Sequence, residues 1–222
     1  MKSITTGDHH QPTMSITFLI IIITCIVSII AFNREKMKDD LLFWPYFIQK
    51  DGQYYRFLTN GVLHADAMHL IFNMVSFYSF GMALENYLFK ALFGDLSRAL
   101  LAILYVTAIV AAVIPDFIKY KNQSHYRSLG ASGAVSAIVF AAITIQPNMP
   151  IQFFFIPFKI PGFVFGICFL LLSASLAKKG GGNIGHSAHF WGSMYGIVFT
   201  YLAAKLLAGV DLIRMFIDTT FN

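Results

Sequence analysis

The feature that most constrains this sequence is a series of long apolar runs that contain almost no charged side chains. Six such runs occupy residues 15–33, 67–88, 99–115, 132–145, 160–177 and 185–207. A hydrocarbon core about 30 Å thick needs roughly 20 mainly apolar residues in helical form. No run alternates with the period of two that a membrane β-strand requires. The pattern therefore predicts an all-α membrane protein, a bundle of six transmembrane helices with a long first loop.

Composition excludes the main soluble alternatives. Of the 222 residues, 57% are hydrophobic and 12% are charged, whereas an average soluble domain carries about 25% charged residues. A water-soluble enzyme would lack polar side chains for its surface. The formal charge of +5 does not indicate a nucleic-acid partner, because the Lys and Arg residues lie in short clusters between apolar runs. Cys25 and Cys168 both lie inside such runs and are expected to be core residues.

The chain is expected to form one domain, residues 15–207, between a polar N-terminal tail (1–14) and a short C-terminal tail (208–222). The fourth run is short, and we expect its helix to begin a turn earlier, near Leu129. Prolines around residues 153–156 predict a non-helical segment at the membrane interface.

Charged residues in the loops bear on orientation. If the N-terminus is cytoplasmic, the inner segments carry six Lys and Arg residues and the outer segments ten. The positive-inside rule favours the reverse arrangement. Charge counting alone therefore predicts an N-terminus outside the cytoplasm.

Two polar residues stand at the starts of parallel apolar runs. Ser132 begins the fourth run and His189 lies near the start of the sixth, so both are expected at the same side of the membrane. Small residues recur every fourth position beside them, at Gly133, Ala137 and Ala141 and at Ala188, Gly192 and Gly196. Facing ridges of small residues let two helices approach closely. A serine hydroxyl and an imidazole brought together in this way form a nucleophile–base pair.

Each of these residues also has a simpler reading. A serine at a helix start is often an N-cap, and a lone interfacial histidine often bonds a backbone carbonyl. His69 and Asn73 share one face of the second run, where they could donate to the oxyanion of a tetrahedral intermediate. They could equally form interhelical hydrogen bonds that only stabilise the bundle.

A metal site is the other use considered for the histidines. His64, His69, His186 and His189 include a His-x-x-His pair. The sequence lacks an HExxH motif, and inside the runs no carboxylate or cysteine lies near these histidines, since Glu85 is several turns further along its helix than His69. We therefore expect neither a metal nor another cofactor.

In combination these motifs resemble the rhomboid family of intramembrane serine proteases. The matching elements follow in family order over residues 44–207: Tyr55-Arg56-Phe57-Leu58-Thr59, His64, the run from His69 to Asn73, Gly81, Glu85, Gly130-Ala131-Ser132-Gly133, and Ala188-His189 with Gly192 and Gly196. The resemblance implies a six-helix rhomboid-like bundle whose active site lies below the membrane surface in a water-filled cavity.

The resemblance also implies a role for each matched residue. Ser132 would be the nucleophile and His189 the general base, without a carboxylate. Asn73, His69 and the Ser132 backbone N–H would form the oxyanion hole. The supporting residues would be His64, Gly130 at the substrate backbone, Arg56 as anchor of the first loop, and Glu85 in a polar network. Residues 178–183 would cap the site, and the fifth helix, from about Ile160, would be a lateral gate.

One position departs from the family pattern. Many members carry an aromatic residue one turn after the nucleophile, where it stacks on the base, but this chain has Ser136 there. Phe190 and Trp191 are the substitutes that the sequence suggests.

The family also implies a cytoplasmic N-terminus, against the charge count, and we follow the family. We expect a multi-pass protein of a bacterial inner membrane that cleaves transmembrane protein substrates within the lipid bilayer.

Two other functions remain as alternatives. A catalytically inactive relative would bind transmembrane segments without cleaving them, although such relatives are expected to lack the serine or the histidine. A small transporter would be expected to place charged residues or broken helices at the midplane, whereas the polar residues here gather near one surface.

Overall fold

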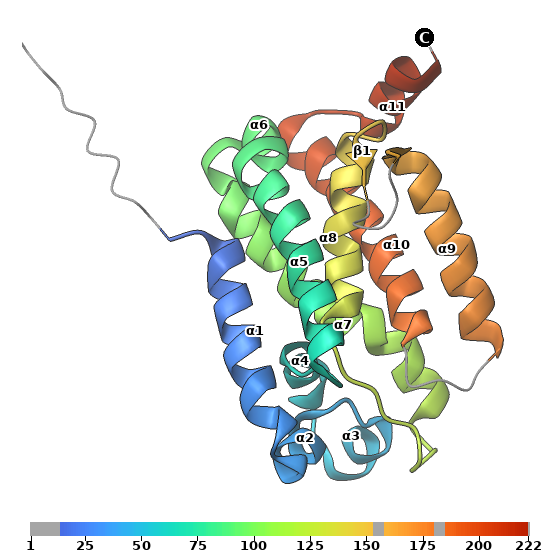
Figure 1. Cartoon of the computed structure of the whole chain (residues 1–222). Coiled ribbons are helices and arrows are strands. Elements are labelled where there is room, and N and C mark those ends of the chain that lie inside the picture. Colours follow the sequence, from blue (N-terminus) through green and yellow to red (C-terminus); the bar gives the residue numbers. More distant parts are fainter. Residues whose placement is uncertain (1–13, 153–157, 180–184, 222) are drawn as a thin grey trace, which may run out of the picture.

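A computed structural model describes residues 14–152, 158–179 and 185–221, and within this part the fold is almost entirely helical (Figure 1). The long helices are α1 (Ile16–Phe32), α5 (Ala67–Ala83), α7 (Ser97–Tyr120), α8 (Ser132–Ile145), α9 (Gly162–Lys179) and α10 (His186–Ala203). They correspond in order to the six apolar runs, which confirms the prediction of an all-α fold.

Short elements connect the long helices. The first loop contains α2 (Glu35–Leu41), α3 (Pro45–Asp51), α4 (Arg56–Thr59) and the 3-10 turn η1 (Asn60–Val62). The π-helical turn η2 (Leu84–Leu88), α6 (Phe89–Phe93) and η3 (Gly94–Leu96) join α5 to α7, and η4 (Ala204–Ala208) and α11 (Leu212–Phe221) follow α10. The antiparallel strands β1 (Pro150–Ile151) and β2 (Ile160–Pro161) precede α9.

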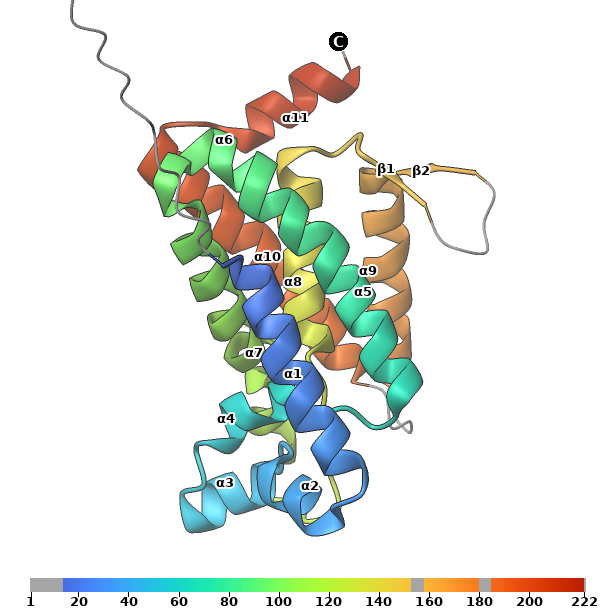
Figure 2. The same ribbon diagram turned by 60° about the vertical axis from the view of Figure 1, so that its left-hand side comes forward.

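Helix α8 lies at the centre of the bundle, among α5, α7, α9 and α10 (Figures 1 and 2). Every residue of this helix except Ser132 and Thr144 is buried. Its many alanines and its glycine occupy little volume, so neighbouring helices can approach its backbone. The first residue of the most deeply buried helix is therefore the predicted nucleophile.

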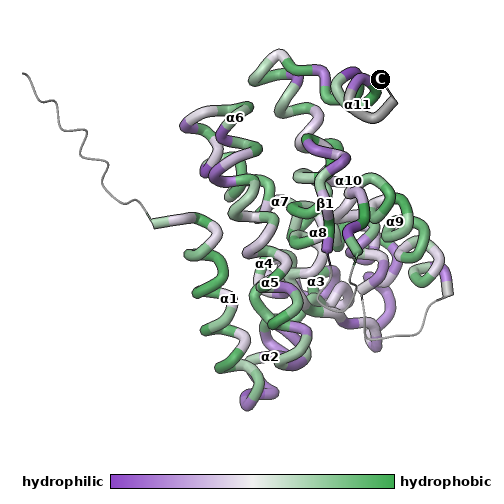
Figure 3. Tube along the Cα trace, turned by 45° about the horizontal axis from the view of Figure 1, so that its top comes forward, coloured by the Kyte–Doolittle hydropathy of each residue, from purple (hydrophilic) through white to green (hydrophobic). Residues whose placement is uncertain are grey.

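Helix α1 shows which surface faces lipid. Its buried residues are Thr17, Thr24, Ser28 and Ala31, and its exposed side chains are large and apolar. A helix on a soluble protein has the reverse arrangement. Hydrophobic residues run along most of α1 and α9 in Figure 3. The outer surface of these helices is suited to contact with hydrocarbon.

Span length alone is less informative here. Helical structure is continuous from Ala67 to Tyr120, and this stretch is long and apolar enough to cross a membrane. Gly94 has φ +58° within it, and α5 and α7 run in opposite directions (Figure 2). Helix α10 and its extension η4 meet the same criterion of length and apolar composition only when α11 is counted with them, and α11 is bent away from them by 103°. Helices α1, α8 and α9 are also apolar, but they are shorter than this criterion requires.

Two predicted helix boundaries are wrong. Helix α8 begins at Ser132 and not near Leu129, because Gly130 has φ +127°, a conformation that a right-handed helix does not contain. Helix α7 continues beyond Pro115 to Tyr120. A proline inside a helix removes one backbone hydrogen bond, but packing of the last turns retains the helix here, with Asp116 buried.

Parts of the earlier predictions fall outside the described residues. These are most of the N-terminal tail, the predicted interfacial segment at 153–156, and the greater part of the predicted cap at 178–183. Within the predicted C-terminal tail, residues 212–221 form α11, which lies across one end of the bundle (Figure 1).

Candidate active site

The close contact between α8 and α10 depends on glycines. A Cβ atom added to Gly192 would overlap the carbonyl group of Gly133 and lie 3.0 Å from its Cα. A Cβ atom at Gly196 would overlap the Ala137 carbonyl and lie 2.7 Å from the Ala137 Cα. These successive contacts show that the helices run parallel and that the small-residue ridges face each other, as the sequence predicts.

The same contact places Ser132 and His189 beside each other's helix. A Cβ atom at Gly133 would lie 3.1 Å from the Ala188 carbonyl oxygen, so the neighbours of Ser132 and His189 in sequence touch. Both side chains are half-buried. Within the described part of the chain, however, no hydrogen bond joins the Ser132 hydroxyl to the His189 imidazole. Catalytic hydrogen bonds are often longer in the absence of substrate.

An aromatic ring beside His189 comes from α9. The rings of Phe169 and His189 have centroids 5.9 Å apart and planes inclined by 33°. The sequence analysis suggested Phe190 or Trp191, but these two rings contact each other. Phe169 therefore supplies the aromatic neighbour of His189 that Ser136 cannot supply. No local spacing relates it to His189, because the contact depends on how α9 packs.

Helix α5 contributes His69 and Asn73 from its first two turns. The Asp66 carboxylate caps the helix by accepting from the His69 backbone N–H at 2.8 Å. The Asn73 side-chain amide is buried and donates to the His69 carbonyl at 3.0 Å, with its second proton still available. Both side chains thus lie on one face, as their spacing predicts.

Gly130 connects this face of α5 to the start of α8. A Cβ atom at Gly130 would lie 2.8 Å from Cε1 and 3.2 Å from Nε2 of His69. Its positive φ also favours glycine, and its N–H donates to the Asn60 carbonyl at 3.0 Å. His69 therefore packs against the backbone two residues before Ser132.

His64 lies behind His69 and has no exposed surface. The two rings make a T-shaped contact with centroids 5.0 Å apart. Burial, aided by the nearby His69 ring, lowers the pKa of His64 to about 3. His64 is therefore a neutral imidazole at any pH near neutrality.

Arg56 organises the first loop. Its guanidinium is buried and donates to the carbonyls of Asp39 at 2.7 Å and Leu42 at 2.8 Å, and to the Gln53 side chain at 2.6 Å. Charge-assisted bonds of this kind are the stronger ones in proteins. The side chain holds three parts of the loop together next to η1, which carries Asn60.

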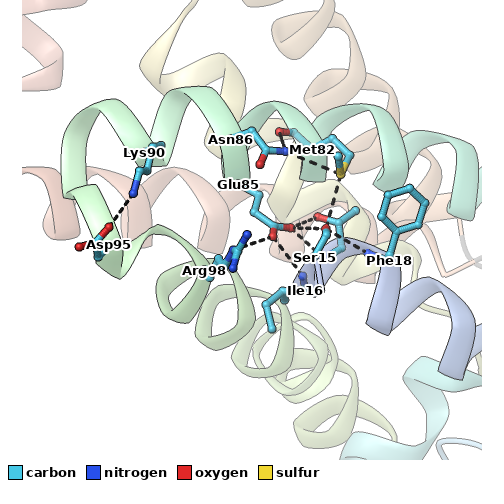
Figure 4. A network of polar contacts seen from close by, with 10 residues as sticks. Ser15, Ile16, Phe18, Met82, Glu85, Asn86, Lys90, Asp95 and Arg98 are labelled. Carbon is cyan, nitrogen blue, oxygen red and sulfur yellow. Dashed lines mark hydrogen bonds and ion pairs between the residues drawn. The ribbon is translucent and has the colours of Figure 1, made fainter. Parts of the chain in front are cut away.

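Glu85 holds a polar network at the far end of α5 (Figure 4). Its carboxylate accepts from the hydroxyls of Ser15 at 2.7 Å and Thr17 at 2.8 Å. It also accepts from the backbone N–H groups of Ile16 and Thr17 and pairs with Arg98 at 3.2 Å. This network joins α1, η2 and α7.

A metal site and an apolar groove are the two other places where this fold could bind a ligand. Among the described residues, no three His, Cys, Asp or Glu side chains are grouped to hold a metal ion. An apolar groove of about 490 Å³ lies between α8, α9, α10 and α11 and includes Phe140, Tyr201 and Phe216. It opens at the end of α8 opposite Ser132.

Comparison with known proteins identifies the family of this chain. The family model for the Rhomboid domain matches residues 51–206. The RHOMBOID-like protein 12, mitochondrial, of Arabidopsis thaliana is 30% identical over 73% of this chain and 50% of its own length. The rhomboid protease GlpG of Haemophilus influenzae is 24% identical over 85% of this chain and 91% of its own length. The chain thus spans half the plant relative and most of the bacterial one.

The matched region includes every residue proposed for the site, from Arg56 to His189. It also contains the contacting glycine ridges of α8 and α10. The chain is an integral membrane protein that belongs to the rhomboid family.

Proposed function

We propose that this chain is an intramembrane serine endopeptidase that hydrolyses peptide bonds in or next to transmembrane segments through Ser132 and His189. The observation that carries the proposal is the contact of Gly133 with Ala188, because α8 and α10 then meet one residue from Ser132 and one residue from His189. Membership of the rhomboid family and the similarity to a protein named rhomboid protease support it.

In the proposed reaction His189 takes the Ser132 hydroxyl proton as Oγ attacks the substrate carbonyl carbon. The negative oxygen of the tetrahedral intermediate accepts from Asn73, His69 and the Ser132 backbone N–H. Collapse breaks the C–N bond, and the His189 imidazolium protonates the leaving amine. A water molecule then attacks the acyl-enzyme as His189 takes its proton. Collapse of this second tetrahedral intermediate breaks the C–Oγ bond and releases the acid as His189 returns the proton to Ser132.

Six helices span the membrane in this proposal: α1, α5, α7, α8, α9 and α10. The active-site end faces outside and the N-terminus is cytoplasmic. A bacterial inner membrane is the proposed location, although the plant relative is named as mitochondrial. A substrate helix must unwind before its carbonyl can be attacked, so we expect Pro, Gly or polar residues near the cleaved bond.

The alternative is an inactive rhomboid-like protein that binds transmembrane segments. One observation favours it: Ser132 and His189 make no direct hydrogen bond in the described structure. Cleavage of a model transmembrane substrate in proteoliposomes distinguishes the two functions. We expect Ser132→Ala to abolish cleavage with an unchanged melting temperature.

Ser136→Ala is the matched control, because Ser136 is a second serine of α8 and lies one turn further along the helix. It should retain cleavage. If Ser132→Ala protein cleaves the substrate as fast as the unaltered protein, Ser132 is not the nucleophile.

A further inference from the structure

Ser28, on the buried side of α1, makes two short contacts across the bundle. Its Oγ lies 2.8 Å from the Val62 carbonyl oxygen and 2.9 Å from Nδ1 of His64. The side chain has no exposed surface. Neither the motif analysis nor the proposed reaction assigns a role to this residue.

The donors and acceptors present on the three groups determine the direction of both hydrogen bonds. A carbonyl oxygen only accepts, so the single hydroxyl proton of Ser28 is donated to Val62. The Ser28 oxygen must then accept at its second contact, which requires a proton on Nδ1 of His64. A neutral imidazole carries one N–H, so His64 holds its proton on Nδ1 and a lone pair on Nε2.

The other nitrogen of His64 has an unusual environment. Its Nε2 atom is buried and has no hydrogen-bond partner among the described residues. The ring stays neutral near pH 7 because burial lowers the pKa of His64 to about 3. Because Nε2 has no partner there, the bond of Ser28 with Nδ1 is the only side-chain hydrogen bond of this ring among the described residues.

His64 in turn limits the movement of His69. The His69 ring makes a T-shaped contact with the His64 ring, and the two ring centroids are 5.0 Å apart. It also packs on Gly130, where an added Cβ would lie 2.8 Å from its Cε1. The His69 imidazole is thus confined between the His64 ring and the backbone at Gly130. Of these two, only the His64 ring is held by a residue of α1.

We propose that Ser28 is a positioning residue for the oxyanion hole: its hydroxyl locks the orientation and tautomer of His64, and the locked ring holds His69 in place. The proposal rests on the proposed function, because it assigns His69 to the oxyanion hole. It makes α1, a lipid-facing helix, a support of the catalytic site.

The kinetic test compares Ser28→Ala with a control on the same helix. We expect Ser28→Ala to lower kcat about 3- to 10-fold, which corresponds to one lost hydrogen bond, with KM unchanged. Thr24→Ala is the control, because Thr24 is buried one turn earlier on the same face of α1 and makes no hydrogen bond to His64 among the described residues. It should leave kcat unchanged. Ser28→Thr keeps a hydroxyl, so it should retain most of the kcat of the unaltered protein.

A double-mutant cycle separates positioning from general stability. In a His69→Ala background, Ser28→Ala should have no further effect on kcat, because the residue that it positions is absent. Equal fold losses in both backgrounds would overturn the proposal.

The tautomer itself is measured by ¹⁵N solid-state NMR of histidine-labelled protein in bilayers, with His64→Gln identifying the resonances. The proposal predicts a proton on Nδ1 of His64, and a mixture of tautomers in Ser28→Ala. A proton on Nε2 in the unaltered protein would overturn it. This readout does not depend on catalysis, so it remains decisive even if Ser132→Ala protein stays active and the proposed function fails.

Discussion

The two ends of α5 and its extension both bury polar groups, but they satisfy them differently. Glu85 lies in η2, sixteen residues after His69, or about 24 Å along a helix. Its carboxylate accepts from two hydroxyls and two backbone N–H groups and pairs with Arg98 (Figure 4). At the other end, Nε2 of His64 has no hydrogen-bond partner among the described residues, and the Asn73 side-chain amide makes one hydrogen bond there.

This difference indicates different roles. A buried network whose members are all bonded makes the structure rigid. Buried groups left with spare donors or acceptors cost stability and need another explanation. We interpret the Glu85 end as the structural clamp of α1, η2 and α7. In the proposed function, the second amide proton of Asn73 at the His69 end is kept for a substrate, at the expense of stability.

The largest effect that tests this comparison is expected at Glu85. Glu85→Ala removes the acceptor of the buried Thr17 hydroxyl and backbone N–H, at about 1–3 kcal/mol for each unsatisfied donor, so it should destabilise the protein by about 3–5 kcal/mol. Unfolding in mild detergent micelles measures this loss. The folded fraction should cleave substrate at close to the normal rate.

Asn86→Ala serves as the control for Glu85, because Asn86 is adjacent and exposed. A loss of stability below about 1 kcal/mol in Glu85→Ala would mean that the network contributes no more than an exposed ion pair.

The opposite behaviour is expected at Asn73. Asn73→Ala removes a proposed oxyanion donor and should lower kcat about 10²–10³-fold. Its only described side-chain bond is to its own helix, so unfolding should change little. Ser79→Ala is a control on the same helix, because Ser79 is exposed and bonds only the Val75 carbonyl. A normal kcat in Asn73→Ala would remove Asn73 from the oxyanion hole.

Near neutral pH the smallest effect concerns the cost of burying His64. The pKa of His64 is about 3 in the folded protein and about 6.5 when unfolded. The unfolded state therefore binds an extra proton below pH 6.5, and stability should fall from there toward pH 3. The slope is at most about 1.4 kcal/mol per pH unit. His64→Gln should lose this contribution, so parallel stability profiles of the two proteins would contradict it.

The sequence was most informative where residues that lie close together in space also follow the four-residue spacing of one helix face. The four-residue repeats at Gly133 and Gly192 predicted the contact of α8 with α10, because a helix face is fixed by its own periodicity. The same reasoning correctly placed His69 and Asn73 on one face of α5. The start of α8 was missed because one backbone angle at Gly130 decides it.

Contacts that depend on the packing of distant helices could not be predicted. Phe169 reaches His189 only because α9 packs beside α10, and no motif encodes that placement. The bond of Ser28 with His64 belongs to the same class. The buried series Thr17, Thr24, Ser28 and Ala31 does follow a helical face, and this pattern could have marked the inner side of α1.

The central claim is that His189 activates Ser132 as a nucleophile, and labelling by a fluorophosphonate probe tests it most directly. The account predicts covalent labelling at Ser132, identified by mass spectrometry of the labelled peptide. It also predicts that His189→Ala slows labelling about 10²–10⁴-fold, the usual contribution of a general base. Labelling of folded His189→Ala protein at the normal rate, or of another serine in place of Ser132, would contradict the account.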